Sequence, residues 1–308
     1  MAARDRIAPY LRPTPLRRYP GLDRLVGAEV WVKHENHQPT GAFKIRGGIN
    51  LVSQLGPEER SAGLIAASTG NHGQSVAYSA DLFGVAATIC VPEGANRTKV
   101  AAMRDLGATI VEHGRDFDEA RARAEELAAE HGYRYVNSGN EPDLIEGVGT
   151  YMQEIVEECE IDVVIVPVGG GSGAAGTCIT AKAQDRDIEV VAAQAEAAPA
   201  ACLSWRSRSL IEGEMRTAAE GLATRVPFEL PQRVMWDLLD DFVLVSEDEI
   251  FSATQTMIEL TRNLVEGAGA TSLAGALKIS SRLRGKRVAL VCSGGNITVD
   301  QLRTLLAR

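Results

Sequence analysis

Short apolar runs alternate along the chain with amphipathic stretches of helical length. Seven runs have the length of a buried strand: Val30–Lys33, Leu64–Ala67, Ala87–Val91, Thr109–Val111, Val163–Val168, Val190–Gln194 and Val288–Cys292. Helical patterns fill the intervals, as in Asp116–His131 and in Ser246–Leu264, where Ser246 and Glu249 form a capping box. This alternation is typical of parallel βαβ units, so the pattern predicts an α/β fold.

The length of 308 residues exceeds that of one small domain. The chain shows no repeat, low-complexity run or flexible linker, so we expect two domains that are interleaved rather than strung in series. The expected division is a large domain made of residues 1–52 and 141–308, with residues 53–140 inserted in it as a small domain. The irregular stretch Trp205–Glu229 is interpreted as a surface excursion of the large domain.

Charge and composition narrow the class of ligand. The net charge is −9 and the pI is near 5.2, which argues against nucleic acid and anionic membranes as partners, because both require a basic face. A small molecule is the expected ligand. The sequence contains no run near 20 apolar residues and no apolar leader, and its five cysteines are scattered, so we expect a cytoplasmic protein with reduced thiols.

The first segment with chemical interest is Pro39-Thr40-Gly41-Ala42-Phe43-Lys44. Pro39 and Gly41 mark a turn, Thr40 is a candidate helix cap, and Lys44 then falls in the first turn of a helix. The helix dipole and partial burial both favour the free amine, which a Schiff-base lysine requires. The plain alternative is a solvated helix lysine.

Two further segments place polar groups directly after strands. Ser68-Thr69-Gly70-Asn71-His72 follows the run Leu64–Ala67, and Ser293-Gly294-Gly295-Asn296 follows Val288–Cys292. The carboxyl ends of parallel strands are where open α/β sheets bind ligands. Each segment by itself is equally consistent with a capped turn between a strand and a helix.

A glycine-rich loop, Gly169-Gly170-Gly171-Ser172-Gly173, lies between the run Val163–Val168 and a helix expected from about Ala174. Such a loop lets backbone N–H groups approach a phosphate. The phosphate need not be that of a single cofactor, because residues 171–176 also fit a dinucleotide-binding fingerprint and Glu196 stands where its ribose-binding acid would lie.

Taken in order, these segments resemble those of the fold-type II pyridoxal-phosphate enzymes, specifically the serine/threonine dehydratase and serine racemase group. The similarity runs from Arg12-Pro13-Thr14-Pro15-Leu16 to the Ser293–Asn296 turn and thus covers nearly the whole chain. A dinucleotide-binding enzyme would leave Lys44, Asn71 and Ser293 without roles. The resemblance implies a tryptophan synthase β-like fold of two interleaved domains, each with a mainly parallel sheet flanked by helices.

The resemblance also implies a role for each segment. Lys44 would hold pyridoxal 5'-phosphate as a Schiff base, Asn71 would bond its phenolic oxygen and Ser293 its pyridine nitrogen. The other implied cofactor contacts are Phe43, Gly169, Gly170, Gly171, Ser172, Gly173, Gly221 and Glu266. The loop that receives the substrate carboxylate would consist of Ser68, Thr69, Gly70, Asn71 and His72.

The implied reaction is dehydration and deamination of a β-hydroxy amino acid. Lys44 would take the α-proton, the cofactor would stabilise the carbanion, and loss of the β-hydroxyl would lead to a 2-oxo acid and ammonia. A neutral serine at the pyridine nitrogen favours elimination over transamination. The substrate stays open among L-threonine, L-serine, 3-phenylserine, hydroxyaspartate and ectoine-derived amino acids.

The sequence departs from the family pattern at two places. Thr69 stands where racemases carry a second acid–base serine, and its extra methyl group disfavours racemisation. Gln194 and Ala200 stand where carboxylates bind a divalent cation, so we expect no such metal site, with Glu196 the sole substitute and room for a monovalent cation. The chain ends soon after the last motif, so no regulatory domain is expected, and the family suggests a homodimer.

Three other functions are compatible with the same motifs. The first is serine racemase-like racemisation. The second is β- or γ-replacement, as in cysteine or threonine synthases, which would need a sulfide or phosphate subsite that the sequence does not reveal. The third is a binding or regulatory protein without catalysis, against which the presence of Lys44 argues.

Overall fold

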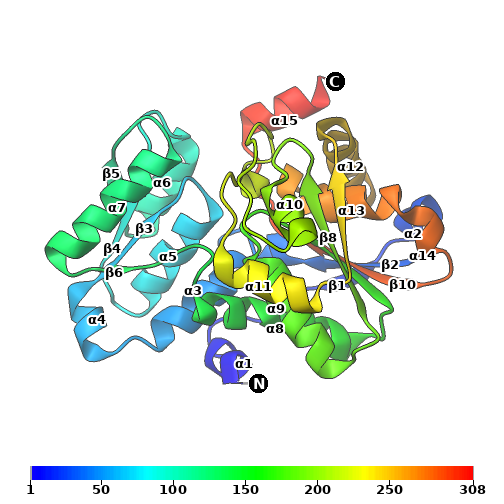
Figure 1. Cartoon of the computed structure of the whole chain (residues 1–308), viewed down its shortest axis with the longest axis horizontal. Coiled ribbons are helices and arrows are strands. Elements are labelled where there is room, and N and C mark those ends of the chain that lie inside the picture. The colour runs from blue at the N-terminus through cyan, green and yellow to red at the C-terminus, as the bar shows by residue number, and fades with distance from the viewer. Residues whose placement is uncertain (1, 308) are drawn as a thin grey trace. The chain divides into compact units, whose positions relative to one another are not determined.

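The computed structural model describes residues 2–307 (Figure 1). Its fold is built on two β-sheets. The chain divides into unit 1, Met1–Leu11 and Lys44–Gly147, and unit 2, Arg12–Phe43 and Val148–Arg308. Each unit contains one mainly parallel sheet with helices packed on it. The predicted α/β class, with two interleaved parts, is therefore confirmed.

Unit 1 takes in more of the chain than the expected small domain, because residues 1–11, 44–52 and 141–147 also belong to it. The reason is close helix packing. A methyl group added at Gly48 would lie 2.4 Å from Ser75 Oγ, and one at Gly47 would lie 2.8 Å from Leu144 O. Arg6 Nε also donates to Asn50 Oδ1 (2.8 Å). These segments lie far apart in the sequence, and no local sequence pattern predicts that they pack together.

Unit 1 is built on a four-stranded parallel sheet of order β5-β4-β3-β6. Its elements are α1 (Ala2–Ile7), α3 (Lys44–Ser53), α4 (Pro57–Ala62), β3 (Leu64–Ala67), α5 (Asn71–Leu82), β4 (Ala87–Val91), α6 (Arg97–Asp105), β5 (Thr109–Glu112), α7 (Phe117–His131), β6 (Arg134–Tyr135) and the start of α8 (Pro142–Glu158). Alternate residues of β3 and β4 face opposite sides of the sheet. Leu64, Ala66 and Ile89 pack with α5 and α6, whereas Ile65 and Cys90 pack with α7.

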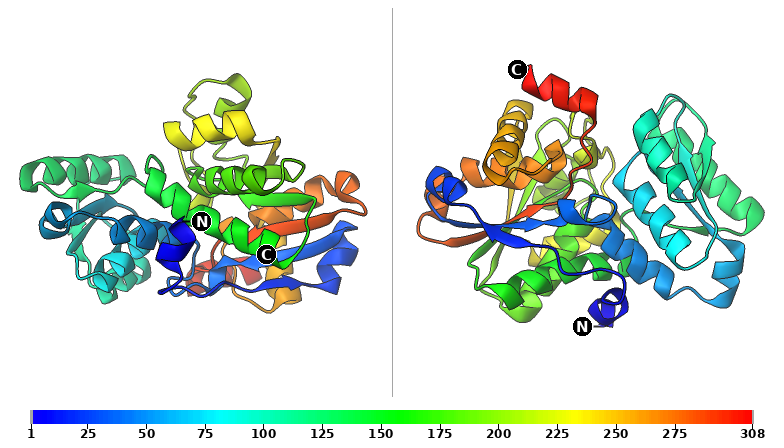
Figure 2. Two further views of the ribbon diagram at one scale, coloured as in Figure 1. Left: turned by 90° about the horizontal axis from the view of Figure 1, so that it is seen from below. Right: turned by 180° about the vertical axis from the view of Figure 1, so that it is seen from behind.

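Unit 2 is built on a six-stranded sheet of order β1-β2-β10-β7-β8-β9, in which only the edge pair β1–β2 is antiparallel. Its elements are β1 (Leu16–Arg18), α2 (Pro20–Val26), β2 (Glu29–His34), η1 (Glu35–His37), the rest of α8, β7 (Val163–Pro167), α9 (Ser172–Gln184), β8 (Glu189–Ala195), α10 (Ala200–Ser207), η2 (Glu220–Leu222), α11 (Glu229–Leu238), β9 (Asp241–Val245), α12 (Glu247–Thr261), α13 (Gly267–Lys278), α14 (Ser280–Leu283), β10 (Arg287–Cys292) and α15 (Val299–Leu306). Helices cover both faces of this sheet (Figure 2).

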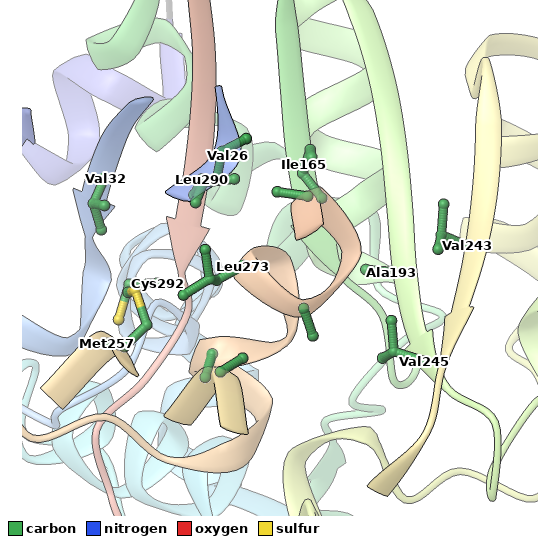
Figure 3. Packing of buried hydrophobic residues seen from close by; sticks show 14 of the residues in the cluster. Val26, Val32, Ile165, Ala193, Val243, Val245, Met257, Leu273, Leu290 and Cys292 are labelled. Carbon is green, nitrogen blue, oxygen red and sulfur yellow. The ribbon is translucent and has the colours of Figure 1, made fainter. Parts of the chain in front are cut away.

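The two faces of the central strands hold separate hydrophobic clusters. One face packs against α2, α12 and α13, and Figure 3 shows Leu273 and Met257 from these helices beside Leu290 and Cys292 of β10. The opposite face packs against α8, α9, α10 and α11. Because both faces are buried, the central strands read as continuous apolar runs, which is why the sequence pattern located them.

The polar segments singled out above follow the carboxyl ends of β3, β7 and β10. The carboxyl ends of parallel strands lie at the same end of a sheet. The loop after β3 therefore leaves the carboxyl end of the unit 1 sheet, and the loops after β7 and β10 leave the carboxyl end of the unit 2 sheet. Among residues 2–307 there is no helix whose length and apolar content would let it cross a membrane.

Candidate active site

Lys44 is the first residue of α3, and the segment before it is fixed by backbone hydrogen bonds. The Phe43 N–H donates to Ser293 O (3.0 Å), and the Gly41 N–H donates to Gln38 O (2.7 Å). Gly41 has a φ of +67°, which strains any residue with a side chain, so this turn requires glycine. The predicted place of Lys44 in the first turn of a helix is confirmed, whereas Thr40 lies too far before α3 to cap it.

Groups of unit 1 contact Lys44 at both its amine and its backbone carbonyl. Lys44 Nζ donates to Ser138 O (3.3 Å), and Ser75 Oγ donates to the carbonyl oxygen of Lys44 (2.7 Å). Burial lowers the pKa of the Lys44 amine from 10.5 to about 8. Near pH 8 a large share of the molecules therefore carries Lys44 as the free amine, which is the form that attacks a carbonyl carbon.

The lowered pKa of the Lys44 amine predicts how the protein takes up pyridoxal phosphate, the aldehyde cofactor that the sequence resemblance implies. Because only the free amine attacks, the rate of uptake of pyridoxal phosphate should rise with pH and level off above about pH 8. Stopped-flow absorbance from about pH 6 to about pH 10 measures this rate. A rate that continues to rise about tenfold per pH unit beyond pH 9 would contradict the lowered pKa, since it would indicate an amine of ordinary basicity.

Ser68 shapes the loop between β3 and α5. Its hydroxyl oxygen accepts hydrogen bonds from the Gly70 N–H (3.2 Å) and the Gly73 N–H (2.9 Å), so it satisfies donors at the start of α5. The hydroxyl hydrogen can still donate to a bound group. Thr69 and Asn71 are partly exposed beside it, with Asn71 as the first residue of α5. The loop therefore offers hydroxyl and amide donors in a small volume, which suits a carboxylate.

His72 is buried and neutral. Its Nε2–H donates to Val136 O (3.1 Å), and burial, together with the nearby charge of Lys44, lowers the pKa of His72 to about 3. The imidazole therefore cannot supply a positive charge to a substrate carboxylate at neutral pH. Lys44 and His72 both belong to unit 1.

In unit 2 the glycine-rich loop follows β7 and leads into α9, which begins at Ser172 rather than near Ala174. Gly171 is the N-cap residue, with a φ of +92°, and it has no side chain with which to cap the helix. The N–H groups in the first turn of α9 have no acceptor within the helix itself. A helix of this length with glycines before its first turn is suited to bind a phosphate.

The other candidate residues of unit 2 gather around this loop. A methyl group added at Gly169 would lie 2.4 Å from Gly221 O, and one at Gly173 would lie 3.4 Å from the Phe43 ring. A methyl group at Gly294 would lie 2.4 Å from Glu266 Oε1, and one at Gly221 would lie 3.8 Å from the same oxygen. The fold thus brings Phe43, Gly221, Glu266 and the glycine loop together.

We expect Gly169→Ala to weaken cofactor binding about tenfold or more and to lower the free energy of unfolding by roughly 1–3 kcal/mol, because the new methyl group would displace the backbone of Gly221. Titration of the apoprotein with pyridoxal phosphate gives the dissociation constant. Gly56→Ala is the matched control, since its methyl group would have 3.9 Å of clearance. An unchanged dissociation constant in Gly169→Ala would contradict a role of this loop in holding the cofactor.

Ser293 directly follows β10 and is nearly buried. Its carbonyl oxygen accepts from the Phe43 N–H, and the neighbouring Gly294 O accepts from the Glu266 N–H (3.2 Å). Asn296 Nδ2 donates to Thr40 O (2.8 Å). The turn that starts at Ser293 therefore holds the segment before Lys44 and leaves the Ser293 hydroxyl at the end of the strand.

A buried charged network in unit 2 was not predicted. Lys33 Nζ lies 2.5 Å from Glu154 Oε2 and also donates to Thr14 O (2.8 Å). Thr14 Oγ1 donates to Glu35 Oε1 (2.6 Å). This hydrogen bond ties Thr14, in the segment where the family resemblance begins, to a residue shortly before Lys44 in the chain. Lys33 and Glu154 are separated by 121 positions, and no local pattern in the sequence pairs them.

Gln194 and Glu196 lie in the segment where the related enzymes were expected to carry carboxylates for a divalent cation. Gln194 is fully buried, and its Oε1 accepts from the Cys202 N–H (3.0 Å), while Glu196 is exposed. No cluster of three or more His, Cys, Asp or Glu side chains that could hold a metal ion occurs in residues 2–307.

The candidate site residues are divided between the two units. Unit 1 contains Lys44 and Ser68–His72. Unit 2 contains Phe43, Gly169–Gly173, Gly221, Glu266 and Ser293.

Comparison with known proteins gives consistent matches over nearly the whole chain. Residues 7–294 match the family model of pyridoxal-phosphate dependent enzymes. The chain is 38% identical over 288 residues to an L-threonine ammonia-lyase of Thermotoga maritima, covering 92% of this chain and 71% of that protein. It is 36% identical over 307 residues to an L-threo-3-hydroxyaspartate ammonia-lyase of Saccharomyces cerevisiae, covering 99% and 94%. The structure of maize serine racemase superimposes with a TM-score of 0.94 at 31% identity, covering 99% and 95%.

Proposed function

The chain belongs to the pyridoxal-phosphate dependent enzymes, and on that premise we propose that it is an ammonia-lyase that converts a β-hydroxy amino acid to a 2-oxo acid and ammonia. The proposal rests chiefly on Lys44, which is the first residue of α3 and whose buried amine has a pKa of about 8. A lysine of this kind supplies both the attachment point and the base for such a reaction.

The residues present fit the cofactor. We propose that Lys44 binds its aldehyde carbon, that Gly169–Gly173 bind its phosphate and that the Ser293 hydroxyl forms a hydrogen bond with its pyridine nitrogen. Asn71 would bond the phenolic oxygen, with Phe43, Gly221 and Glu266 beside the ring. The fit is supported by the lowered pKa of Lys44 and by the close approach of Gly169 to Gly221 O, which leaves no room for a side chain.

When bound, pyridoxal phosphate supplies an electron-withdrawing ring that acidifies the α-carbon of an attached amino acid. The protein supplies the remaining chemistry. Lys44 would be the base that takes the α-proton, for which an amine pKa of about 8 is well matched. Ser68 and Asn71 orient the substrate carboxylate, and the hydroxyl leaves from the β-carbon. The neutral Ser293 limits protonation of the ring nitrogen and so favours elimination.

We propose L-threonine as the first substrate to test and L-threo-3-hydroxyaspartate as the second. The two ammonia-lyases of Thermotoga maritima and Saccharomyces cerevisiae are named for these amino acids, and the identities of 38% and 36% do not separate them. Both substrates share the amine, the α-carboxylate and the β-hydroxyl on which the proposed residues act. L-serine and 3-phenylserine complete the panel by varying the side chain.

The test is release of 2-oxo acid and ammonia in equal amounts from each of these four amino acids. Activity with one or more of them supports the proposal and names the substrate. A holoenzyme that shows the bound-cofactor absorbance but releases neither product from any of them would contradict it. Formation of a D-amino acid in place of 2-oxo acid would instead favour racemisation, with Thr69 as the second acid–base group.

Two further properties follow as proposals. The family resemblance supports a homodimer as the working unit. A cytoplasmic location is supported by the five cysteines, all of which are free thiols, four of them buried. Burial raises the pKa of Cys90 and Cys159 to about 11, so these thiols stay protonated and unreactive at neutral pH.

A further inference from the structure

A buried glutamine beside the glycine-rich loop has no hydrogen-bond partner. Gln232 lies in α11 and is only 1% exposed. Across the described part of the chain, residues 2–307, neither Nε2 nor Oε1 of Gln232 has a partner. Such an amide is costly, because its donor and its acceptor have both lost their water. Since most buried polar groups in proteins are paired, an unpaired amide indicates a partner from outside the chain.

The direction of the Gln232 side chain follows from the geometry of α11. A helical side chain leans toward the N-terminus of its helix and covers the turn before it. For Gln232 this is the turn that begins at Phe228, and a methyl group added at Gly170 would lie 2.7 Å from Phe228 Cε2. Glu229 and Arg233 form an exposed ion pair (2.5 Å), which marks the solvent side of α11. The buried amide of Gln232 is therefore directed toward the side of α11 that packs on Gly170.

Two neighbours of Gln232 in α11 contact the next glycine of the same loop. A methyl group added at Gly171 would lie 2.9 Å from Pro231 Cβ and 3.1 Å from Met235 Cε. Pro231 immediately precedes Gln232, and Met235 follows it by one helical turn. Of these residues and Phe228, Gln232 alone carries a polar side chain, so it supplies the polar group of a face that is otherwise apolar.

The loop beside Gln232 is the start of α9, a helix of 13 residues. Gly171 is the N-cap residue, and it has no side chain that could accept from the first N–H groups of the helix. These N–H groups and the helix dipole favour an anion. The Nε2 group of Gln232 is a further donor, and a water molecule held between the anion and the amide can donate to Oε1. The unpaired amide and the helix N-terminus thus indicate the same class of ligand, an anion with several acceptor oxygens such as a phosphate.

We infer that Gln232 is a cofactor-binding residue, whose Nε2 donates a hydrogen bond to the phosphate of pyridoxal phosphate at the Gly169–Gly173 loop. The inference rests on the proposed function, since it concerns the cofactor of the same site. The cofactor contacts that the family resemblance implies include no residue of α11. Gln232 therefore adds a side-chain donor to a phosphate site that otherwise consists of the glycine loop and Ser172.

The test compares pyridoxal phosphate with pyridoxal, which has the same aldehyde but no phosphate. The dissociation constants of both compounds are measured by titrating the apoprotein and following absorbance. The variants are Gln232→Met and Gln232→Leu, which replace the amide with apolar atoms. Thermal unfolding of each apoprotein shows whether the amide has a role within the protein itself. Gln153→Met is the matched control, because Gln153 Nε2 donates to Glu157 Oε1 (3.2 Å) at the surface of α8.

Both Gln232 variants should bind pyridoxal phosphate about 10- to 100-fold more weakly and bind pyridoxal within about threefold of wild type. Their apoproteins should melt at or above the wild-type temperature, because the substitution removes a buried amide that has no partner. Gln153→Met should bind both compounds as wild type does. Equal weakening of both compounds, an unchanged affinity for pyridoxal phosphate, or an apoprotein that melts below wild type or fails to fold would overturn the inference.

Failure of the proposed function gives a different result. A wild-type protein that binds pyridoxal phosphate more tightly than pyridoxal, but releases no 2-oxo acid from the substrate panel, would refute the lyase proposal. The role of Gln232 would then still be decided by the comparison of the two aldehydes.

Discussion

Lys44→Ala should abolish release of 2-oxo acid, with turnover reduced by about 10³-fold or more, because the substitution removes both the covalent attachment point and the base. The variant should also lose the absorbance of covalently bound cofactor. Activity assays with the substrate identified by the panel and absorbance spectra of the purified protein measure these two effects. Lys44→Arg should be equally inactive, since a guanidinium stays protonated at the assay pH and cannot act as a base.

Lys278→Ala is the matched control, because Lys278 is a partly exposed lysine that pairs with Glu249 on the surface of unit 2. Its activity and cofactor content should equal those of wild type. If Lys44→Ala retained a tenth or more of wild-type turnover, another group would have to be the base, and the proposed role of Lys44 would be wrong.

Glu154→Ala and Lys33→Met should each lower the free energy of unfolding by about 3–5 kcal/mol, since either change leaves the other charge buried without its partner. Lys33 is fully buried and Glu154 nearly so, and the pair also holds the backbone of Thr14. Guanidinium unfolding followed by circular dichroism measures the loss.

The double variant Lys33→Met/Glu154→Leu should recover most of this stability, because two apolar side chains can replace a buried ion pair without leaving a charge behind. Arg303→Met provides a surface control. Arg303 pairs with Asp300 on α15, both residues are highly exposed, and its loss should cost less than about 1 kcal/mol. Single variants that unfold no more readily than Arg303→Met would show that the buried pair contributes nothing to stability.

The strands of the sheet centres were predictable because burial on both faces leaves a direct mark on the sequence. All seven apolar runs correspond to strands, with bounds that differ by at most one residue at either end. The capping box at Ser246 and Glu249 is present at the start of α12, as predicted. The strands that were not predicted are β1, β6 and β9. Two of them have only three and two residues, and all three lie at sheet edges, where the pattern of burial is weaker.

The loops that carry the candidate site were also predictable, because glycine and hydroxyl residues follow apolar runs there. The hydrogen bonds and the burial of the individual side chains were not predictable. Ser68 was expected as a substrate contact, yet its oxygen is already engaged with the N–H groups of Gly70 and Gly73. The buried His72 donates a hydrogen bond to the carbonyl oxygen of Val136, which is 64 positions away. Long-range packing of this kind leaves no periodic signal in a single sequence.

The most direct test of the central claim is to trap the cofactor on the protein. Reduction of the holoenzyme with borohydride, followed by proteolysis and mass spectrometry, locates the lysine that carries the cofactor. The chain has six lysines, and the account predicts that the reduced cofactor is found on Lys44 alone. Label on any of the other five, or no covalent label in a protein that binds the cofactor, would contradict it.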